Sequence, residues 1–179
     1  MALQAADPVA DIVLQINSPG AQVHSVLALT DVINALSCPV RTVAFGFVAG
    51  TSNLLLASGA KGKRGMMPNA RLMLQQPFGY AAGSAPEVHV TATEVSRNLQ
   101  VVNTMLAARC GRTLQEVEEA TDRDMYLGGE AAVAFGLVDE VVVSGKFPGN
   151  GTPEPLREAG VKVAEMAKLA NKRAVTGYD

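Results

Sequence analysis

The chain has 179 residues, of which 48% are hydrophobic and 18% are charged, and its formal net charge is -2 at pH 7. This length fits one domain with a sizeable core, because a domain of this size buries roughly 70% of its unfolded surface. The balance of charge leaves no basic footprint for nucleic acid, and aromatic residues are only 4% of the chain. We therefore predict a globular protein that does not bind nucleic acid.

Cysteine and histidine are too scattered to predict a metal site. Cys38 and Cys110 form no CxxC motif, and His24 and His89 each lie within a helical pattern. We expect buried, reduced thiols and neither a metal ion nor another cofactor. No apolar run approaches the ~20 residues of a membrane helix, and the first eight residues do not resemble a signal peptide. We expect a soluble protein without a membrane partner.

The first part of the chain alternates between apolar runs and a helical pattern. Residues 11–16 form an apolar run that ends in turn residues, which predicts a buried strand. The helix that follows has apolar residues at spacings of three and four: Val26, Leu29, Ile33 and Leu36. Residues 40–48 are apolar almost throughout, which predicts a second strand, parallel to the first and covered on both faces.

A tight turn at residues 49–51 follows this strand and leads into a helix that begins near Ser52. Such a strand, turn and helix raise one residue to the tip of a sheet, where a nucleophile would sit, and here that residue is Gly50. Beyond this helix we expect residues 61–64 to form an exposed basic loop, and residues 70–75 predict a third strand. The alternation of strands and helices predicts an α/β fold with right-handed parallel crossovers.

A long helix dominates the second part of the chain. It follows a glycine-bearing segment at residues 76–83, begins with a capping box of Ser84 and Glu87, and ends at Gly111. Its apolar stripe covers about five turns: Val88, Ala92, Val95, Leu99, Val102 and Leu106. We expect a helix of this length to project from the domain or to span it.

Shorter elements follow the long helix. Thr113 and Glu116 form a second capping box, which predicts a short helix. Residues 122–124 form a charged turn, and residues 137–143 predict a last strand.

Several runs, in a fixed order and without large insertions, carry a family resemblance: Ile16-Asn17-Ser18-Pro19-Gly20, residues 57–64, Pro68-Asn69-Ala70-Arg71, Gln76-Pro77, Thr121-Asp122-Arg123-Asp124, Glu130-Ala131 and residues 135–139. Together they resemble ClpP, the proteolytic subunit of the Clp protease, and more closely its inactive relative ClpR. The resemblance implies a ClpP/crotonase-like spiral of ββα units with a projecting handle helix over residues 1–145, then a linker and tail over residues 146–179. The chain begins within the helix that follows the family's axial loop and first strands, so we expect the N-terminal part of the family domain to be absent.

The resemblance places the family's catalytic triad on one retained and two replaced residues. The nucleophilic serine falls on Gly50, the histidine before the Gln-Pro pair falls on Gln75, and the aspartate falls on Asp124. Glycine has no side chain, and a glutamine amide has no useful proton affinity near neutral pH. Losing nucleophile and base together removes roughly 10⁶-fold of rate in a triad enzyme, so we predict no intrinsic peptidase activity.

By the same resemblance the oxyanion positions fall on Ala21 and Thr51. Both still offer a backbone N–H, although a methyl group at Ala21 restricts the backbone relative to glycine. Ser52 is the alternative nucleophile for an active peptidase with a rewired site. Two steps along a helix turn a side chain by about 200°, so we expect Ser52 to cap the helix instead.

The resemblance also implies a function in assembly. The family stacks two heptameric rings around a degradation chamber, and an ATPase chaperone of the Clp/Hsp100 class feeds protein substrates into it. The handle joins the rings, and here it would include Gly83, Ser84 and Glu87, while Arg123 matches the arginine that pairs across that interface. We predict a non-catalytic member of a tetradecameric hetero-oligomer of ClpP and ClpR subunits. Mixed rings of this kind imply the chloroplast stroma or, alternatively, the cyanobacterial cytoplasm.

Two other functions stay open: the rewired serine peptidase, and an acyl-CoA enzyme of the crotonase type. The crotonase-type enzymes share the spiral fold and use oxyanion donors at the same turns. The handle helix and the run at residues 121–124 favour the protease branch.

Overall fold

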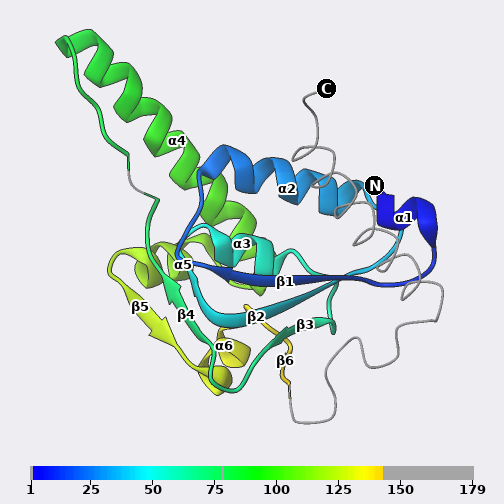
Figure 1. Cartoon of the computed structure of the whole chain (residues 1–179). Coiled ribbons are helices and arrows are strands. Elements are labelled where there is room, and N and C mark those ends of the chain that lie inside the picture. The colour runs from blue at the N-terminus through cyan, green and yellow to red at the C-terminus, as the bar shows by residue number, and fades with distance from the viewer. Residues whose placement is uncertain (1, 78, 143–179) are drawn as a thin grey trace, which may run out of the picture. The chain divides into compact units, whose positions relative to one another are not determined.

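Strand β2 (Val40–Ala49) holds the sheet together because it pairs with three neighbours. The computed structural model describes residues 2–77 and 79–142, and in this part of the chain six strands form one sheet (Figure 1). Along one edge β2 pairs in parallel with β1 (Ile12–Ser18). Along the other edge it pairs in parallel first with β3 (Arg64–Met66) and then with β4 (Arg71–Leu74). One strand therefore positions the ends of three others.

Two short strands complete the sheet. Strand β6 (Glu140–Val141) lies beyond β3 in parallel, and β5 (Met125–Leu127) lies beyond β4 in the antiparallel direction. The six helices of the described chain are α1 (Ala2–Ala6), α2 (Val23–Ala35), α3 (Ser52–Ala57), α4 (Ala85–Cys110), α5 (Leu114–Thr121) and α6 (Gly129–Phe135). Strands and helices are interspersed along the chain, which confirms the predicted α/β class.

The hydrophobic core is centred on α3, whose residues are all buried and which packs against β2, α2 and α4. The largest apolar side chains that are fully buried are Val26, Val43, Val48, Leu54, Leu56, Met66, Leu72, Leu74, Val117, Leu137 and Val138. The stripe predicted on α2 is only partly covered, because Leu29 is 52% exposed. Both cysteines are free and buried, as predicted, and burial raises the pKa of the Cys110 thiol to about 11.

Helix α4 extends well beyond the sheet (Figure 1). Its predicted capping box is confirmed, since the Ser84 N–H donates to Glu87 Oε2 at 2.7 Å, and it ends at Gly111 in the left-handed conformation. Its buried residues lie between Val102 and Cys110, so the predicted apolar stripe is buried only along the C-terminal half. Among the described residues no helix is both long enough and apolar enough to cross a membrane.

Some predicted elements differ from the structure. Strands β3 and β5 and helix α6 were not predicted, because three-residue strands and a two-turn helix give little periodicity. The strand predicted at residues 137–143 is reduced to β6, since Leu137 and Val138 are buried outside the ladder. Residues 78 and 143, and the linker and tail predicted at residues 146–179, lie outside the described residues.

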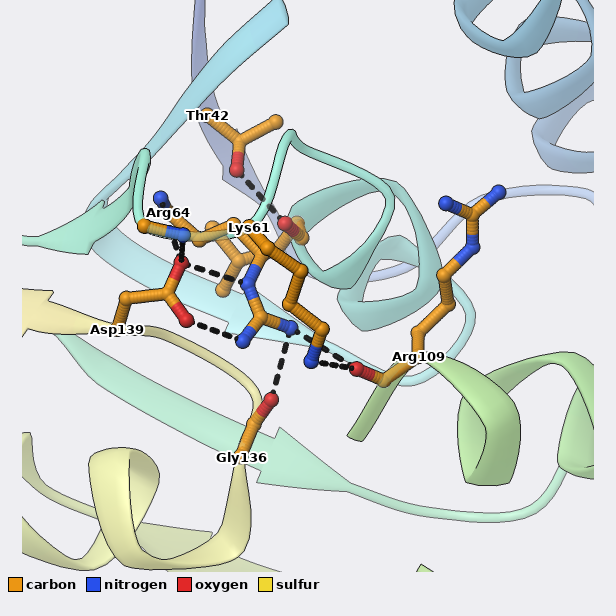
Figure 2. A network of polar contacts seen from close by, with 8 residues as sticks. Thr42, Lys61, Arg64, Arg109, Gly136 and Asp139 are labelled. Atoms are coloured by element: carbon orange, nitrogen blue, oxygen red, sulfur yellow. Dashed lines mark hydrogen bonds and ion pairs between the residues drawn. The ribbon is translucent and has the colours of Figure 1, made fainter. Parts of the chain in front are cut away.

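The prediction of an exposed loop at residues 61–64 is wrong for Arg64, whose side chain is 2% exposed. Its guanidinium pairs with both carboxylate oxygens of Asp139 and also donates to the main-chain oxygens of Arg109, at 3.1 Å, and Gly136, at 2.9 Å (Figure 2). These two oxygens lie at the C-terminal ends of α4 and α6, where carbonyls lack partners within the helix. One side chain therefore ties two helix ends to the sheet.

Asp139 is held ionised by this network. Partial burial opposes its charge, but the hydrogen bonds and charge of Arg64, with the N–H of Gly62, outweigh burial and lower the pKa of Asp139 below its usual 3.8. Because the folded pKa lies below the unfolded one, the resulting stabilisation is fully present above the unfolded pKa. It is lost as the pH falls through the folded pKa.

We predict that Asp139→Asn lowers the free energy of unfolding by about 2–4 kcal/mol near pH 7, because it leaves the buried Arg64 guanidinium without its counter-ion. Urea unfolding between pH 3 and pH 7 measures this, and the deficit relative to the wild-type protein should shrink in the acid range. Glu140→Gln is the matched control. It removes the more exposed pair with Arg41 and should cost at most about 1 kcal/mol. Equal effects of the two substitutions would contradict the role of the network.

Candidate functional site

A cavity of about 470 Å³ lies where β1, β2 and β4 end. These strands are parallel, so their carboxyl ends meet at one edge of the sheet, which is where open α/β sheets bind ligands. The lining comprises residues 19–23 after β1, Gly50 and Thr51 after β2, and residues 75–77 after β4. Four of the positions predicted from the sequence, Ala21, Gly50, Thr51 and Gln75, thus line a single cavity.

Gly50 forms the tight turn between β2 and α3. Its φ is +53°, a left-handed conformation that suits glycine, and its N–H donates to the Met73 carbonyl oxygen at 2.9 Å. Asn53, which was not predicted as a site residue, fixes the turn: its Nδ2 donates to the oxygens of Gly50 at 3.0 Å and Met73 at 2.8 Å. The strand, turn and helix predicted around Gly50 are therefore present.

The side chain of Gln75 reaches the position that a residue-50 side chain would occupy. A Cβ atom built on Gly50 would lie 3.1 Å from Gln75 Nε2. Gln75 follows directly after β4, and the β2–β4 pairing brings that strand end beside the turn. A basic side chain at 75 would be well placed to take a proton from a side chain at 50, whereas the amide of Gln75 cannot act as a general base.

Asp124 approaches the same edge from β5. In the antiparallel pairing of β4 with β5, Leu74 lies opposite Met125, so extending the register by one residue brings Gln75 opposite Asp124. Asp124 is exposed, and its neighbour Arg123 is exposed as well. The structure therefore brings positions 50 and 75 into contact, and the strand pairing places position 124 at the adjacent end of β5.

The two predicted oxyanion positions bind each other. The Thr51 hydroxyl donates to the Ala21 carbonyl oxygen at 2.7 Å and accepts from the Ala21 N–H at 3.2 Å. The methyl group of Ala21 imposes no strain, because the described residues with positive φ are all glycines, among them Gly20 at +136°. The N–H of Ala21 is therefore engaged by a side chain of the same protein.

The prediction that Ser52 caps α3 is wrong. Thr51 is the cap residue, and Ser52 is the first residue of the helix, with its hydroxyl donating to Ser18 Oγ at 3.0 Å. Ser52 is only 1% exposed, and within the described structure its hydroxyl bonds to another hydroxyl rather than to an imidazole or an amine. This environment offers the Ser52 hydroxyl neither a base nor access to solvent.

Three of the four residues predicted for the ring interface, Gly83, Ser84 and Glu87, lie at the start of the projecting helix, whereas Arg123 lies between α5 and β5. Gly83 has a φ of +137°, and Ser84 and Glu87 form the helix cap. The N–H and hydroxyl of Ser84 lower the pKa of Glu87, which keeps the carboxylate ionised as a cap acceptor. In the part of the chain described by the structure, no three His, Cys, Asp or Glu residues are grouped closely enough to hold a metal ion.

The geometry at the turn predicts that Gly50→Ala and Gln75→Ala act non-additively on stability. An alanine at 50 would be strained at positive φ, by about 1–2 kcal/mol, and its Cβ would also press on the Gln75 amide. Truncating Gln75 removes the cost of the contact but not the backbone strain. A double-mutant cycle by urea unfolding should therefore give a coupling energy of at least about 0.5 kcal/mol.

Gly62→Ala separates strain from contact, because Gly62 has a φ of +78° and a Cβ atom added there would meet none of the described residues within 4 Å, apart from its neighbours in the chain. We expect G62A to show the strain cost alone and no coupling to Q75A. Strict additivity of G50A and Q75A would show that the two side chains do not meet.

The sequence was compared with models of known protein families. The model of the Clp protease family matches residues 1–145, a segment that contains every strand described above and the whole of the cavity. The match also spans the turn at Gly50 and the positions at 75 and 124. The chain therefore belongs to the Clp protease family.

Proposed function

We propose that this protein is a catalytically inactive, ClpR-type subunit that assembles with serine-bearing ClpP subunits in the core of an ATP-dependent Clp protease. Membership of the family establishes a ClpP-like subunit of a serine peptidase, a ring-forming protein that works with Clp ATPases. The inactivity of this chain and the mixed composition of its ring are our inference. The turn at Gly50, with the Gln75 amide facing it, is the observation that carries this proposal.

The chemistry at this turn supports inactivity. Peptide hydrolysis by this family of sites needs a nucleophile at the turn and a base beside it, and positions 50 and 75 supply a hydrogen atom and an amide. Loss of both groups is expected to leave roughly 10⁻⁶ of the triad's rate. Asp124 does not compensate, because a carboxylate in a triad acts by orienting the base.

Features unrelated to cleavage are retained, which supports a role in assembly. The long helix α4 has its cap at Ser84 and Glu87 and extends beyond the sheet, and Arg123 is exposed. In the proposed complex, α4 and the segment before it contact the opposite ring, and Arg123 pairs across that interface. The subunit would contribute chamber wall and chaperone-docking surface while reducing the number of cleavage sites. On the ground of the ClpR resemblance, we propose the chloroplast stroma or, alternatively, the cyanobacterial cytoplasm as the location of this complex.

The site gives less support to the two alternatives. A rewired peptidase would need Ser52 as nucleophile, but that hydroxyl is buried and bonded to Ser18. An acyl-CoA enzyme would need free oxyanion donors, but the N–H of Ala21 is bonded to Thr51.

The proposal predicts the composition and reactivity of the native particle. Native mass spectrometry of the complex purified from its source should find this chain in one particle with ClpP paralogues that carry the serine. Treatment of the same particle with a fluorophosphonate probe should label those paralogues, which serve as the internal positive control, and leave this chain unlabelled. A stable particle of this chain alone with peptidase activity, or a label on Ser52, would overturn the proposal.

A further inference from the structure

A pair of hydrogen bonds across the cavity wall joins Thr51 to the main chain of Ala21. One hydroxyl serves both backbone groups of that residue, as donor to the carbonyl oxygen at 2.7 Å and as acceptor from the N–H at 3.2 Å. Thr51 is 6% exposed, whereas Ala21 is exposed at the rim of the cavity. A side chain from the turn after β2 thus reaches the segment after β1 and uses the hydrogen-bonding groups there.

A second hydroxyl pair reinforces this contact. Ser52 Oγ donates to Ser18 Oγ at 3.0 Å, and the Ser18 hydroxyl bonds to the main chain of Gly20. Two consecutive residues at the start of α3 therefore hold the segment at residues 18–21 against the turn. The side chains of Thr51 and Ser52 are themselves buried, which limits the other positions that their hydroxyls can reach.

We propose that the Thr51 hydroxyl closes the cavity to main-chain carbonyl groups, as a block on peptide chemistry that is separate from the losses at Gly50 and Gln75. This inference rests on the proposed function, in which the cavity is a former peptidase site. An incoming carbonyl oxygen, or the oxyanion formed from it, needs a free N–H on the cavity wall. The N–H of Ala21 becomes available only when its bond to Thr51 is broken.

The expected effect on reaction rate follows from what a single oxyanion donor contributes to catalysis. Removing a single oxyanion donor from a serine protease costs about 10²–10³-fold in rate. A chain given back its nucleophile and base would therefore remain slow until Thr51 is also changed. Thr51→Val is suitable because valine matches threonine in shape and lacks the hydroxyl, while Thr51→Ser keeps the hydroxyl and loses the methyl group.

The expected slow reaction is tested in the full-length chain, with a nucleophile and a base introduced by G50S/Q75H. Reaction with a fluorophosphonate forms a bond from the introduced serine oxygen to phosphorus, expels fluoride, and transfers the hydroxyl proton to the introduced imidazole. Adding T51V should raise the labelling rate by about 10²-fold, and adding T51S should leave it near that of G50S/Q75H. Thermal melting of all three variants checks that each is folded. Equal rates with and without T51V would overturn the proposal.

If the G50S/Q75H chain does not react with the probe, hydrogen exchange at the Ala21 amide tests the proposal instead. In the otherwise wild-type chain, T51V should accelerate hydrogen exchange at the Ala21 amide, followed by NMR, while T51S should leave it unchanged. The Gly50 amide, bonded to the Met73 oxygen, is the internal control and should not change. Unchanged exchange at Ala21 in T51V would overturn the proposal. Neither measurement depends on partner subunits, so either can fail while the proposed function stands, and mass spectrometry of the native particle can fail independently.

Discussion

Strand β2 determines where every part of the candidate site lies. Its pairing with β1 positions the segment at residues 18–21, and its pairing with β4 positions Gln75, while its own end forms the turn at Gly50. Strand β5 then brings Asp124 to the same edge through β4. These relations depend on main-chain hydrogen bonds and on the buried faces of the strands, so side chains at the edge can change without disturbing them. The fold therefore does not depend on which side chains stand at this edge, as the inactivity that we propose requires.

The replacements at the site also favour stability. Catalytic sites often hold residues in strained backbone conformations, which cost of order 1–3 kcal/mol each. Here glycine occupies the left-handed position at the turn, and hydroxyl groups satisfy the neighbouring backbone at Ala21. Once a subunit no longer needs to react, such relaxation carries no penalty in activity. The turn at Gly50 and the backbone at Ala21 are therefore relaxed rather than strained, which agrees with the inactivity that we propose.

Features that depend on residues close together in the sequence were predicted well. The capping boxes at Ser84 and Thr113 and the turn at Gly50 act within a few positions, and the structure contains all three. Contacts between distant residues escaped prediction. Arg64 looks like part of a solvated basic loop until Asp139, 75 positions later, is placed beside it. In the same way, Ser52 bonds to Ser18 across 34 positions and Thr51 to Ala21 across 30, and no periodicity or local motif reports such pairs.

Helix α4 has a thermodynamic consequence for the lone polypeptide. Its buried residues begin at Val102, so in the described chain the preceding turns have little tertiary support beyond the partial cover of side chains such as Val95 and Leu99. Helical segments of this length without tertiary support are marginal in water and fray from the end. A macromolecule that docks on these turns must then offset the entropy of ordering them, which lowers the affinity gained per unit of contact area. Association through this helix should consequently weaken steeply on warming and on dilution.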